Sequence, residues 1–410
     1  MIDSTTVFTY IMATTNCYSH LGPIADDSIL GLSTLFQKDP REEKANLTIG
    51  IFLDETGKLP LMKAVEIARN RLMDRREPHG YKPITGYPLF NQRIQELVFG
   101  TESEAVQSKR IFTAQGLGGT GSLHVGARFA QLSLGAKKGV ASAPTWANHL
   151  MILKQAGYEV SQYPYFDPKT KGVDFAAMES YLKTLDPMTV VVLHACCHNP
   201  TGADLTKEEW QKVLEIVQER RLYPLLDIAY QGFGFGVDED AYAPRLFAEA
   251  GIPFMVASSC SKNFGLYGER VGAIHFVTED AHQADLVRMN LAPQIRGEYS
   301  NPPAFGAQVV AEILTDPELR QIWFDEVDGM RTRIRGMREL FAEKGREAGL
   351  DLDFATRQNG MFSFTGLTGE QMDLLMKDWG VYGVRNGRFC MAGLNNRNVD
   401  LVVRAIKAVS

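Results

Sequence analysis

The sequence predicts an α/β protein: a large domain with a mostly parallel central sheet flanked by helices, and a smaller α+β domain. Six short apolar runs have the length of buried strands. Segments with the periodicity of amphipathic helices separate most of them, and this alternation is typical of a parallel sheet covered by helices. A long helical segment then leads into a short C-terminal region that mixes strands and helices.

The strands of the large domain are expected where apolar residues cluster. These runs cover residues 110–113, 138–142, 189–195, 223–228, 253–258 and 271–277. Residues 122–133 and 207–219 place apolar side chains three and four positions apart, which predicts helices that pack one face against the sheet.

A long helix is expected after Pro317, because apolar residues from Trp323 to Phe341 keep helical spacing and Gly345 stands near its end. Short strands are expected near 361–365 and 380–385, and a last helix from about 397. We therefore expect three regions: an N-terminal arm with part of the small domain at 1–59, a large domain at 60–325, and the linking helix with the small domain at 326–410.

Composition excludes several classes of function. Hydrophobic residues make up 45% of the 410 residues, charged residues make up 22%, and the net charge is −6. This balance supports large cores and provides no basic field for nucleic acid or an anionic membrane. No apolar run reaches the ~18 residues of a membrane span. The first 40 residues contain one Lys and no Arg, and the five cysteines form no paired framework, so we expect a soluble cytoplasmic protein.

A glycine-rich loop, AQGLGGTG at residues 114–121, stands between an expected strand and an expected helix. Its G-x-G-x-x-G pattern fits a dinucleotide site, a structural turn or a site for a smaller phosphate. A dinucleotide site needs an acidic residue about 20 positions further on, yet no Asp or Glu occurs between Gly121 and Glu159. The loop therefore favours a small phosphate-bearing cofactor on the N–H groups of a helix N-terminus.

Four other stretches lie at or just after the ends of expected strands, where open α/β sheets bind ligands. They are HACCHNPTG (194–202), LLDIAYQGF (225–233), SSCSKNFGLYGERVG (258–272) and NGRFCMAG (386–393). Together with the glycine loop they resemble the fold-type-I, pyridoxal-phosphate-dependent aminotransferases of the aspartate/aromatic subgroup. The resemblance runs from about Ser28 to the C-terminus and includes GIFLDETGKLP (50–60), APTWANH (143–149) and YSNPPAFGA (299–307). It implies pyridoxal 5′-phosphate as cofactor and amino and 2-oxo acids as substrates.

Lys262 is the expected catalytic amine, because transamination needs a lysine that forms a Schiff base with the cofactor aldehyde and later moves a proton. An isolated lysine is usually a solvated surface charge. Here Ser259, Ser261 and Arg270 surround it as a phosphate-binding set, and the planar fork of an arginine can pair two phosphate oxygens. The backbone of Gly119 and Thr120 would complete that set.

The cofactor ring is expected to contact four further residues. Asp227 ends an apolar strand, and a buried carboxylate there would keep the ring nitrogen protonated; a helix cap is its alternative role. Tyr230 and Asn199 would hydrogen-bond the 3′-oxygen, and Trp146 would stack on the ring. Tyr230 and Trp146 could instead be packed core aromatics. His149 and His194 would lie behind the ring or be ordinary core histidines.

The resemblance also implies the substrate-binding residues. Arg388 matches the arginine that binds the α-carboxylate, and Arg296 matches the one that binds the distal carboxylate of aspartate or glutamate. Gly50, Asn199 and Trp146 also match substrate-binding positions. In this family Arg296 comes from the neighbouring subunit, as does Tyr81, which reaches the phosphate, so a homodimer with shared active sites is expected.

Substrate preference is divided between two hypotheses. Thr120 and Asn301 look like the aspartate type, whereas Leu53 and Gly80 replace polar or basic residues of the aspartate-preferring enzymes. We expect an aspartate aminotransferase with some aromatic activity, and an aromatic or broad-specificity enzyme is the alternative. Phe362 would line the substrate pocket or belong to the core.

Other chemistries are disfavoured. The two His and two Cys of HACCH (194–198) could suggest a metal site, but adjacent cysteines on a strand point to opposite faces and no second ligand pair follows. No metal is therefore expected. A dehydrogenase lacks its acidic residue, and a catalytically dead scaffold would not keep Lys262, Asp227, Arg296 and Arg388. A β-lyase or decarboxylase would more often lack the second arginine.

Overall fold

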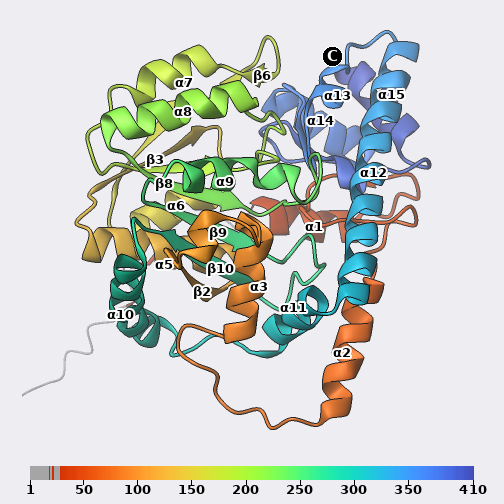
Figure 1. Cartoon of the computed structure of the whole chain (residues 1–410). Helices are drawn as coiled ribbons and strands as arrows, with labels where there is room; N and C mark the ends of the chain where they lie inside the picture. The colour runs from red at the N-terminus through yellow and green to blue at the C-terminus, as the bar shows by residue number, and fades with distance from the viewer. Residues whose placement is uncertain (1–17, 19–20, 23–27) are drawn as a thin grey trace, which may run out of the picture.

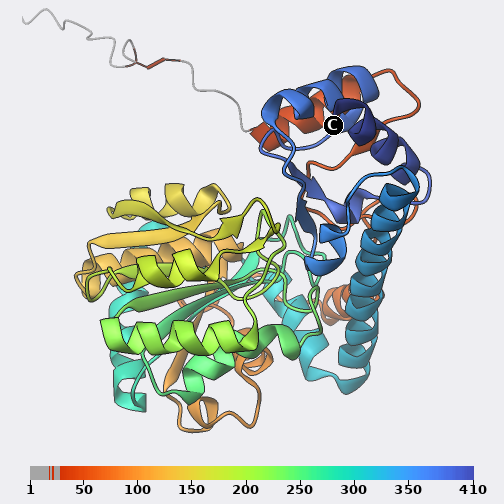
Figure 2. The same ribbon diagram turned by 90° about the horizontal axis from the view of Figure 1, so that it is seen from above.

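The computed structural model describes residue 18, residues 21–22 and residues 28–410. Most of the first 27 residues of the expected N-terminal arm thus lie outside the described residues. Figures 1 and 2 show a sheet-containing part with helices on both sides, and a C-terminal part joined to it by one long helix.

The central sheet has seven strands. In chain order they are β2 (Ile111–Leu117), β3 (Lys138–Ala143), β4 (Glu159–Pro164), β7 (Val190–His194), β8 (Tyr223–Ile228), β9 (Phe254–Ser259) and β10 (Val271–Val277). Their order across the sheet is β2-β10-β9-β8-β7-β3-β4. β10 pairs antiparallel with β2 and β9, and the other pairs are parallel. The predicted mostly parallel α/β sheet is confirmed.

Helices and short elements complete the part of the chain before residue 316. They are α1 (Ser28–Lys38), β1 (Ala45–Asn46), α2 (Lys63–Arg75), α3 (Pro88–Phe99), α4 (Glu104–Gln107), α5 (Gly118–Ser133), α6 (Asn148–Gln155), β5 (Phe166–Asp167), β6 (Gly172–Val173), α7 (Phe175–Leu182), α8 (Lys207–Arg220), a 3₁₀ turn (Glu239–Ala241), α9 (Tyr242–Glu249), α10 (Ala281–Glu298) and α11 (Phe305–Thr315).

Both faces of the sheet are buried, and the alternation of side chains along each strand divides the core in two. In β7, Val190 belongs to the apolar cluster that contains Phe129 of α5, whereas the next residue, Val191, belongs to the cluster that contains Trp210 of α8. Because helices cover both faces, polar ligands can reach these strands only at their ends.

The C-terminal part begins with the expected long helix, α12 (Pro317–Glu347), whose N-terminus is capped by Asp316. It continues through α13 (Phe354–Arg357), β11 (Phe362–Phe364), α14 (Gly369–Trp379), β12 (Val381–Tyr382), β13 (Arg388–Cys390), a 3₁₀ turn (Met391–Gly393) and α15 (Val399–Val409). β1 pairs in parallel with β12, so residues from the start of the chain lie beside its end, as Figure 2 shows.

Three details differ from the sequence prediction. β4 was not expected, because this edge strand exposes most of its side chains and contains no apolar run. The strand before the glycine loop extends to Leu117, since β10 pairs with it along its whole length. Arg388 begins the short strand β13, which pairs with β11 and lies beyond the strand expected at 380–385.

No helix within residues 28–410 combines the length and the apolar character needed to cross a bilayer.

Candidate active site

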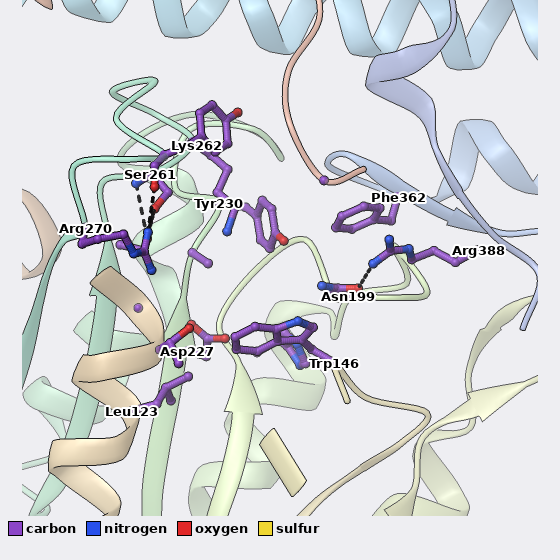
Figure 3. A pocket seen from close by; sticks show the side chains of 17 residues that line it. Leu123, Trp146, Asn199, Asp227, Tyr230, Ser261, Lys262, Arg270, Phe362 and Arg388 are labelled. Atoms are coloured by element: carbon purple, nitrogen blue, oxygen red, sulfur yellow. Dashed lines mark hydrogen bonds between the residues drawn. The ribbon is translucent and has the colours of Figure 1, made fainter. Parts of the chain in front are cut away.

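A cavity of about 240 Å³ lies at the carboxyl-terminal ends of β7, β8 and β9, beside the N-terminus of α5. Residues from the C-terminal part close its other side (Figure 3). Its lining consists of Gly50, Gly119, Thr120, Leu123, Trp146, His194, Asn199, Asp227, Ala229, Tyr230, Ser259, Ser261, Lys262, Tyr267, Arg270, Phe362 and Arg388. The fold therefore brings together every predicted site residue except Tyr81 and Arg296.

One end of the cavity has the character of an anion site. Arg270 donates from Nη1 to the Ser261 hydroxyl at 3.4 Å, and the Ser259 and Ser261 hydroxyls lie 3.2 Å apart. Gly119 and Thr120, in the first turn of α5, line the same end, and that turn contains no acidic residue. Hydroxyls, a guanidinium and a helix N-terminus are the groups that bind phosphate.

Steric constraints explain why glycines occupy this loop beside the anion-binding end of the cavity. Gly118 has a φ of 66°, and a Cβ on it would lie 2.5 Å from Nη2 of Arg270. A Cβ on Gly116 would lie 2.3 Å from the Ser122 hydroxyl. These glycines thus allow the strand, the helix N-terminus and Arg270 to approach one another closely.

Lys262 follows β9, and its half-buried side chain lines the cavity (Figure 3). The pKa of its amine is lowered to about 8: desolvation is the main cause, the charge of Arg270 adds to it, and Asp227 acts in the opposite direction. Its Nζ lies 4.7 Å from the ring centroid of Tyr230. A lysine whose pKa is near 8 is partly neutral at physiological pH and can act as a nucleophile or base.

Asp227 is a buried carboxylate of β8. Its Oδ2 lies 3.1 Å from Nε2 of His149, and Nδ1 of His149 lies 2.8 Å from the Thr145 hydroxyl. Burial alone would raise the pKa of Asp227, but His149 and Lys262 outweigh it and lower that pKa below its ordinary value. Its Oδ1 is buried and has no hydrogen-bond partner among the described residues. An ionised carboxylate with one unused oxygen fits a protonated ring nitrogen.

Tyr230 and Trp146 surround the middle of the cavity. Burial raises the pKa of Tyr230, so its phenol stays protonated and can donate a hydrogen bond. Trp146 lines the cavity edge-on to His149, with ring centroids 5.3 Å apart. His194 lies behind them, and burial lowers its pKa so that the imidazole is neutral.

Arg388 occupies the opposite end of the cavity from Arg270 (Figure 3). Only 5% of it is exposed. It donates from Nη2 to the Thr48 carbonyl at 2.5 Å and from Nη1 to Oδ1 of Asn199 at 3.3 Å. Its guanidinium lies 4.4 Å from the ring centroid of Phe362. A buried guanidinium held at a cavity wall is suited to bind a carboxylate with two hydrogen bonds.

Phe362 answers the question left open by the sequence, because it is both buried in the core and part of the cavity wall. Its ring packs on Gly50, where a Cβ would lie 2.8 Å from Cζ of the ring. At Gly50 the N-terminal segment therefore passes too close to the ring for a side chain to fit without movement.

Tyr81 and Arg296 do not lie at this cavity. Tyr81 is 94% exposed and lines a separate groove with Asn301. Arg296 is exposed on α10 and donates to the Ser300 hydroxyl. Within one chain, neither residue can contact a ligand held by Lys262.

Sequence reasoning missed Tyr267. Its ring lines the cavity, and its hydroxyl accepts a hydrogen bond from the Phe52 amide at 2.9 Å. It lies within the same stretch as Lys262, so its position in that stretch was the available signal.

Cys196 and Cys197 do not lie on a strand with their side chains on opposite faces, as the sequence predicts, so that prediction is wrong. They follow β7 rather than lie on it, and Cys197 has a φ of 52°. This left-handed turn brings both sulfurs within 4.8 Å of each other and of a carboxylate oxygen of Asp240.

The cavity, with its anion-binding end, its amine and its ionised carboxylate, fits an enzyme that uses a phosphate-bearing cofactor. The chain belongs to the class I and II aminotransferases, whose family model matches residues 42–406. It is 44% identical to the aspartate aminotransferase of Pseudomonas aeruginosa over 385 residues, which are 93% of this chain and 97% of that protein. It is 47% identical to the aromatic-amino-acid aminotransferase of Escherichia coli over 390 residues, 94% of this chain and 98% of that one.

A solved structure agrees with this assignment. The aromatic-amino-acid aminotransferase of Burkholderia pseudomallei, crystallised covalently bound to pyridoxal phosphate, matches with a TM-score of 0.94 and 46% identity. The match covers 96% of this chain and 99% of that one. The predicted family and fold are confirmed.

Proposed function

We propose that this chain is a pyridoxal 5′-phosphate-dependent aspartate aminotransferase. It transfers the amino group of L-aspartate reversibly to 2-oxoglutarate, giving oxaloacetate and L-glutamate, and has some activity on aromatic amino acids. The observation that carries the proposal is that a single cavity holds both the amine of Lys262 and the guanidinium of Arg388, with the unused oxygen of Asp227 beside them.

The residues of the cavity fit the cofactor. Ser259, Ser261, Arg270 and the backbone of Gly119 and Thr120 would hold its phosphate, and Lys262 would hold it covalently. Asp227 would accept from the ring nitrogen, Tyr230 and Asn199 would bind the 3′-oxygen, and Trp146 would stack on the ring. When bound, the cofactor supplies an electron sink for the negative charge that develops at Cα of the substrate.

Lys262 would also move the proton. Once the substrate amine has taken its place, Nζ of Lys262 would act as the base that removes the proton from Cα of the substrate. The same amine would then donate that proton to the cofactor. A pKa near 8 suits both directions, because the amine can accept and release a proton at neutral pH. Tyr230 and Trp146 would keep water away from this proton.

Arg388 would orient the substrate. Two parallel hydrogen bonds to the α-carboxylate fix the amino acid relative to Lys262, which lowers the entropic part of the barrier. Asn199 and the Thr48 carbonyl hold the guanidinium at the angle needed for this contact.

A homodimer with shared active sites would complete the pocket. The exposure of Tyr81 and Arg296 supports this proposal, since in a single chain both side chains face solvent and neither lines the active-site cavity. Arg296 of a second copy would bind the distal carboxylate, and Tyr81 of that copy would reach the phosphate. A buried arginine would discriminate strongly against substrates with uncharged side chains.

An aromatic or broad-specificity aminotransferase is the second candidate. Leu53 is half-buried and apolar, and it follows Gly50 of the cavity lining by three positions; an apolar residue there would favour larger side chains. Relatives of both kinds are similarly close, at 44% and 47% identity. A panel of aspartate, tyrosine, phenylalanine, tryptophan and methionine with 2-oxoglutarate decides between them: the aspartate proposal requires the highest kcat/KM for aspartate.

Lys262→Ala tests the central assignment. The variant should lose the visible absorbance of the lysine-bound cofactor and nearly all turnover. Lys171→Ala, which removes a half-buried lysine elsewhere, serves as the control and should keep both. An unchanged spectrum and rate in Lys262→Ala would refute the role of Lys262.

We also infer a cytoplasmic location and a three-part division of the chain. The free, buried thiols of Cys196, Cys197, Cys260 and Cys390 support a reducing compartment. The pairing of β1 with β12 supports residues 1–59 as an arm plus part of the small domain, with the large domain at 60–325 and the linking helix and small domain at 326–410.

A further inference from the structure

A second cavity, of about 160 Å³, lies away from the site above. It is enclosed by α12, by the segment that runs from the end of α13 to Gly360, and by the loop 233–235 that follows Tyr230. Figure 1 shows α13 beside the upper part of α12. Four arginines line it: Arg331, Arg335, Arg338 and Arg357. We call it the arginine cavity.

Arg338 is a buried positive charge at its inner wall, with 3% of the residue exposed. Its guanidinium donates to the carbonyls of Ala355, Asn359, Gly360 and Phe362 and to the Ser363 hydroxyl. Among the described residues no carboxylate lies within ion-pair distance of it. Burial lowers its pKa to about 10, and the buried carboxyl of Asp204 opposes this from further away. The charge is hydrogen-bonded but not neutralised, which is costly in a dry interior.

Two buried polar atoms of the lining lack a partner among the described residues. One is Nε of Arg331, a donor, and the other is Oε1 of Gln358, an acceptor. Only 3% of Gln358 is exposed, and its Nε2 already donates to the Lys171 carbonyl. Buried polar groups are nearly always satisfied, so these atoms indicate a polar guest.

The charges around the arginine cavity leave a positive excess. Asp328 pairs with Nη2 of Arg331, and Glu339 lies 3.5 Å from Arg335. Within the described residues, the side chain of Arg357 makes one hydrogen bond, to the Thr170 carbonyl at 3.4 Å. With the more distant carboxyl of Asp204 included, four guanidinium groups therefore stand against three carboxylates. Arg335 and Arg357 are exposed at the rim and can attract an anion from solvent.

We propose that the arginine cavity binds a small oxyanion, a phosphate or a compact carboxylate. A cavity near 150 Å³ holds a guest about as large as benzene, which is the right size for such an ion. The anion would compensate the charge of Arg338 and accept from Nε of Arg331, and a protonated oxygen or a water carried with it would donate to Gln358. No part of this proposal depends on the reaction catalysed at Lys262.

The site would couple two walls of the active site. Arg331 donates to the carbonyl of Phe235, in the loop that follows Tyr230, and Arg338 donates to the carbonyl of Phe362. An anion held between these arginines would tie the loop to the segment that carries Phe362. We expect it to stabilise the protein and to restrict the movement of Phe362.

The test is a thermal titration of the cofactor-loaded protein. Inorganic phosphate, acetate and chloride are added separately at constant ionic strength, so that general screening is the same in each series. We expect a saturable rise in Tm with phosphate or acetate and none with chloride. The series that saturates identifies whether phosphate or carboxylate chemistry is preferred.

Variants locate the effect. Arg335→Gln/Arg357→Gln should weaken the apparent affinity by about ten-fold, as expected for two lost charge contacts, and Glu339→Gln should strengthen it. Arg404→Gln, which changes an exposed arginine that pairs with Glu43 and does not line the cavity, should change nothing. All variants should keep the native kcat without anion. The proposal is wrong if no anion produces a saturable shift, or if the double variant responds like the native protein.

Discussion

Nε2 of His149 lies 3.1 Å from Oδ2 of Asp227; both side chains are buried, and of the two only Asp227 lines the active-site cavity. This contact lowers the pKa of a carboxyl group that burial alone would raise. It explains how a carboxylate surrounded by apolar strand residues can remain ionised and leave its Oδ1 for a cofactor.

His149→Asn should therefore weaken cofactor binding, most strongly at acidic pH. Because the pKa of Asp227 is lowered in the native fold, the carboxylate stays ionised at every pH above that lowered value. It is protonated only when the pH falls through the lowered pKa. Without His149 that loss begins at higher pH. A hydrogen bond to a charged group contributes about 1.5–3 kcal/mol, so cofactor affinity should fall about ten-fold or more. Equilibrium dialysis between pH 4.5 and 7 measures this.

The control is His275→Asn, which removes an equally buried imidazole that contacts Thr113 and Ser258 and not Asp227. It should lower stability without moving the pH at which cofactor is released. Identical release curves for His149→Asn and the native protein would contradict the role of this contact.

Lys262 should make the stability of the cofactor-free protein depend on pH. Its pKa is lowered from 10.5 to about 8, so the unfolded chain binds more protons between these pH values and stability rises across that window. The shift corresponds to about 3 kcal/mol. Lys262→Met should be more stable than the native apoprotein below pH 8, and this difference should vanish above pH 10.5. Urea denaturation at several pH values measures it; a difference independent of pH would refute the titration of Lys262.

Arg388→Lys should lower kcat/KM for aspartate by about a hundred-fold or more, because an ammonium cannot reproduce two parallel hydrogen bonds to the α-carboxylate. The cofactor absorbance should stay native, since Arg388 lies at the opposite end of the cavity from Arg270 and Ser261. Arg385→Lys is the matched control: it lies three positions earlier and is exposed beside Asp373. Equal kinetics in both variants would exclude Arg388 from substrate binding.

Gly50→Ala should displace the ring of Phe362, because the new Cβ would lie 2.8 Å from its Cζ. The ring also packs against the Arg388 guanidinium, so KM for amino acids should rise several-fold while the protein stays folded. Gly50→Ala/Phe362→Leu removes the overlap and should recover part of the lost affinity. Steady-state kinetics of the two variants and of Phe362→Leu alone provide the comparison; no recovery in the double variant would argue against steric displacement.

Mixed dimers test the shared active site. Arg296→Gln and Lys262→Ala should each be inactive with aspartate as homodimers. When the two chains are mixed equally and allowed to exchange, half of the dimers should contain one intact site, which restores about a quarter of the native activity. The mixture of Arg388→Lys with Lys262→Ala is the control, since both changes affect the same chain's cavity and should not complement. Activity no higher than that of the separate variants would refute sharing.

Much of the fold followed from local patterns. Each of the expected strands of the large domain is present, because buried parallel strands need continuous apolar runs whatever surrounds them. The long helix began at Pro317 for equally local reasons, since Asp316 caps it and proline suits its first turn. Lys262, Asp227 and the serines beside Arg270 could be identified because their chemistry is concentrated in short motifs at strand ends.

The sequence by itself thus determined six of the seven strands of the sheet, several of its helices and the chemistry of the site. Only the tertiary structure decided which distant segments meet there. It placed Arg388 against the carbonyl of Thr48, 340 positions away, and the ring of Phe362 on Gly50. It turned Cys197 into a left-handed conformation that no strand pattern indicates, and it buried Arg338 without a carboxylate. Local propensity depends on neighbours along the chain, whereas these contacts depend on loops closing over hundreds of residues, which no short pattern encodes.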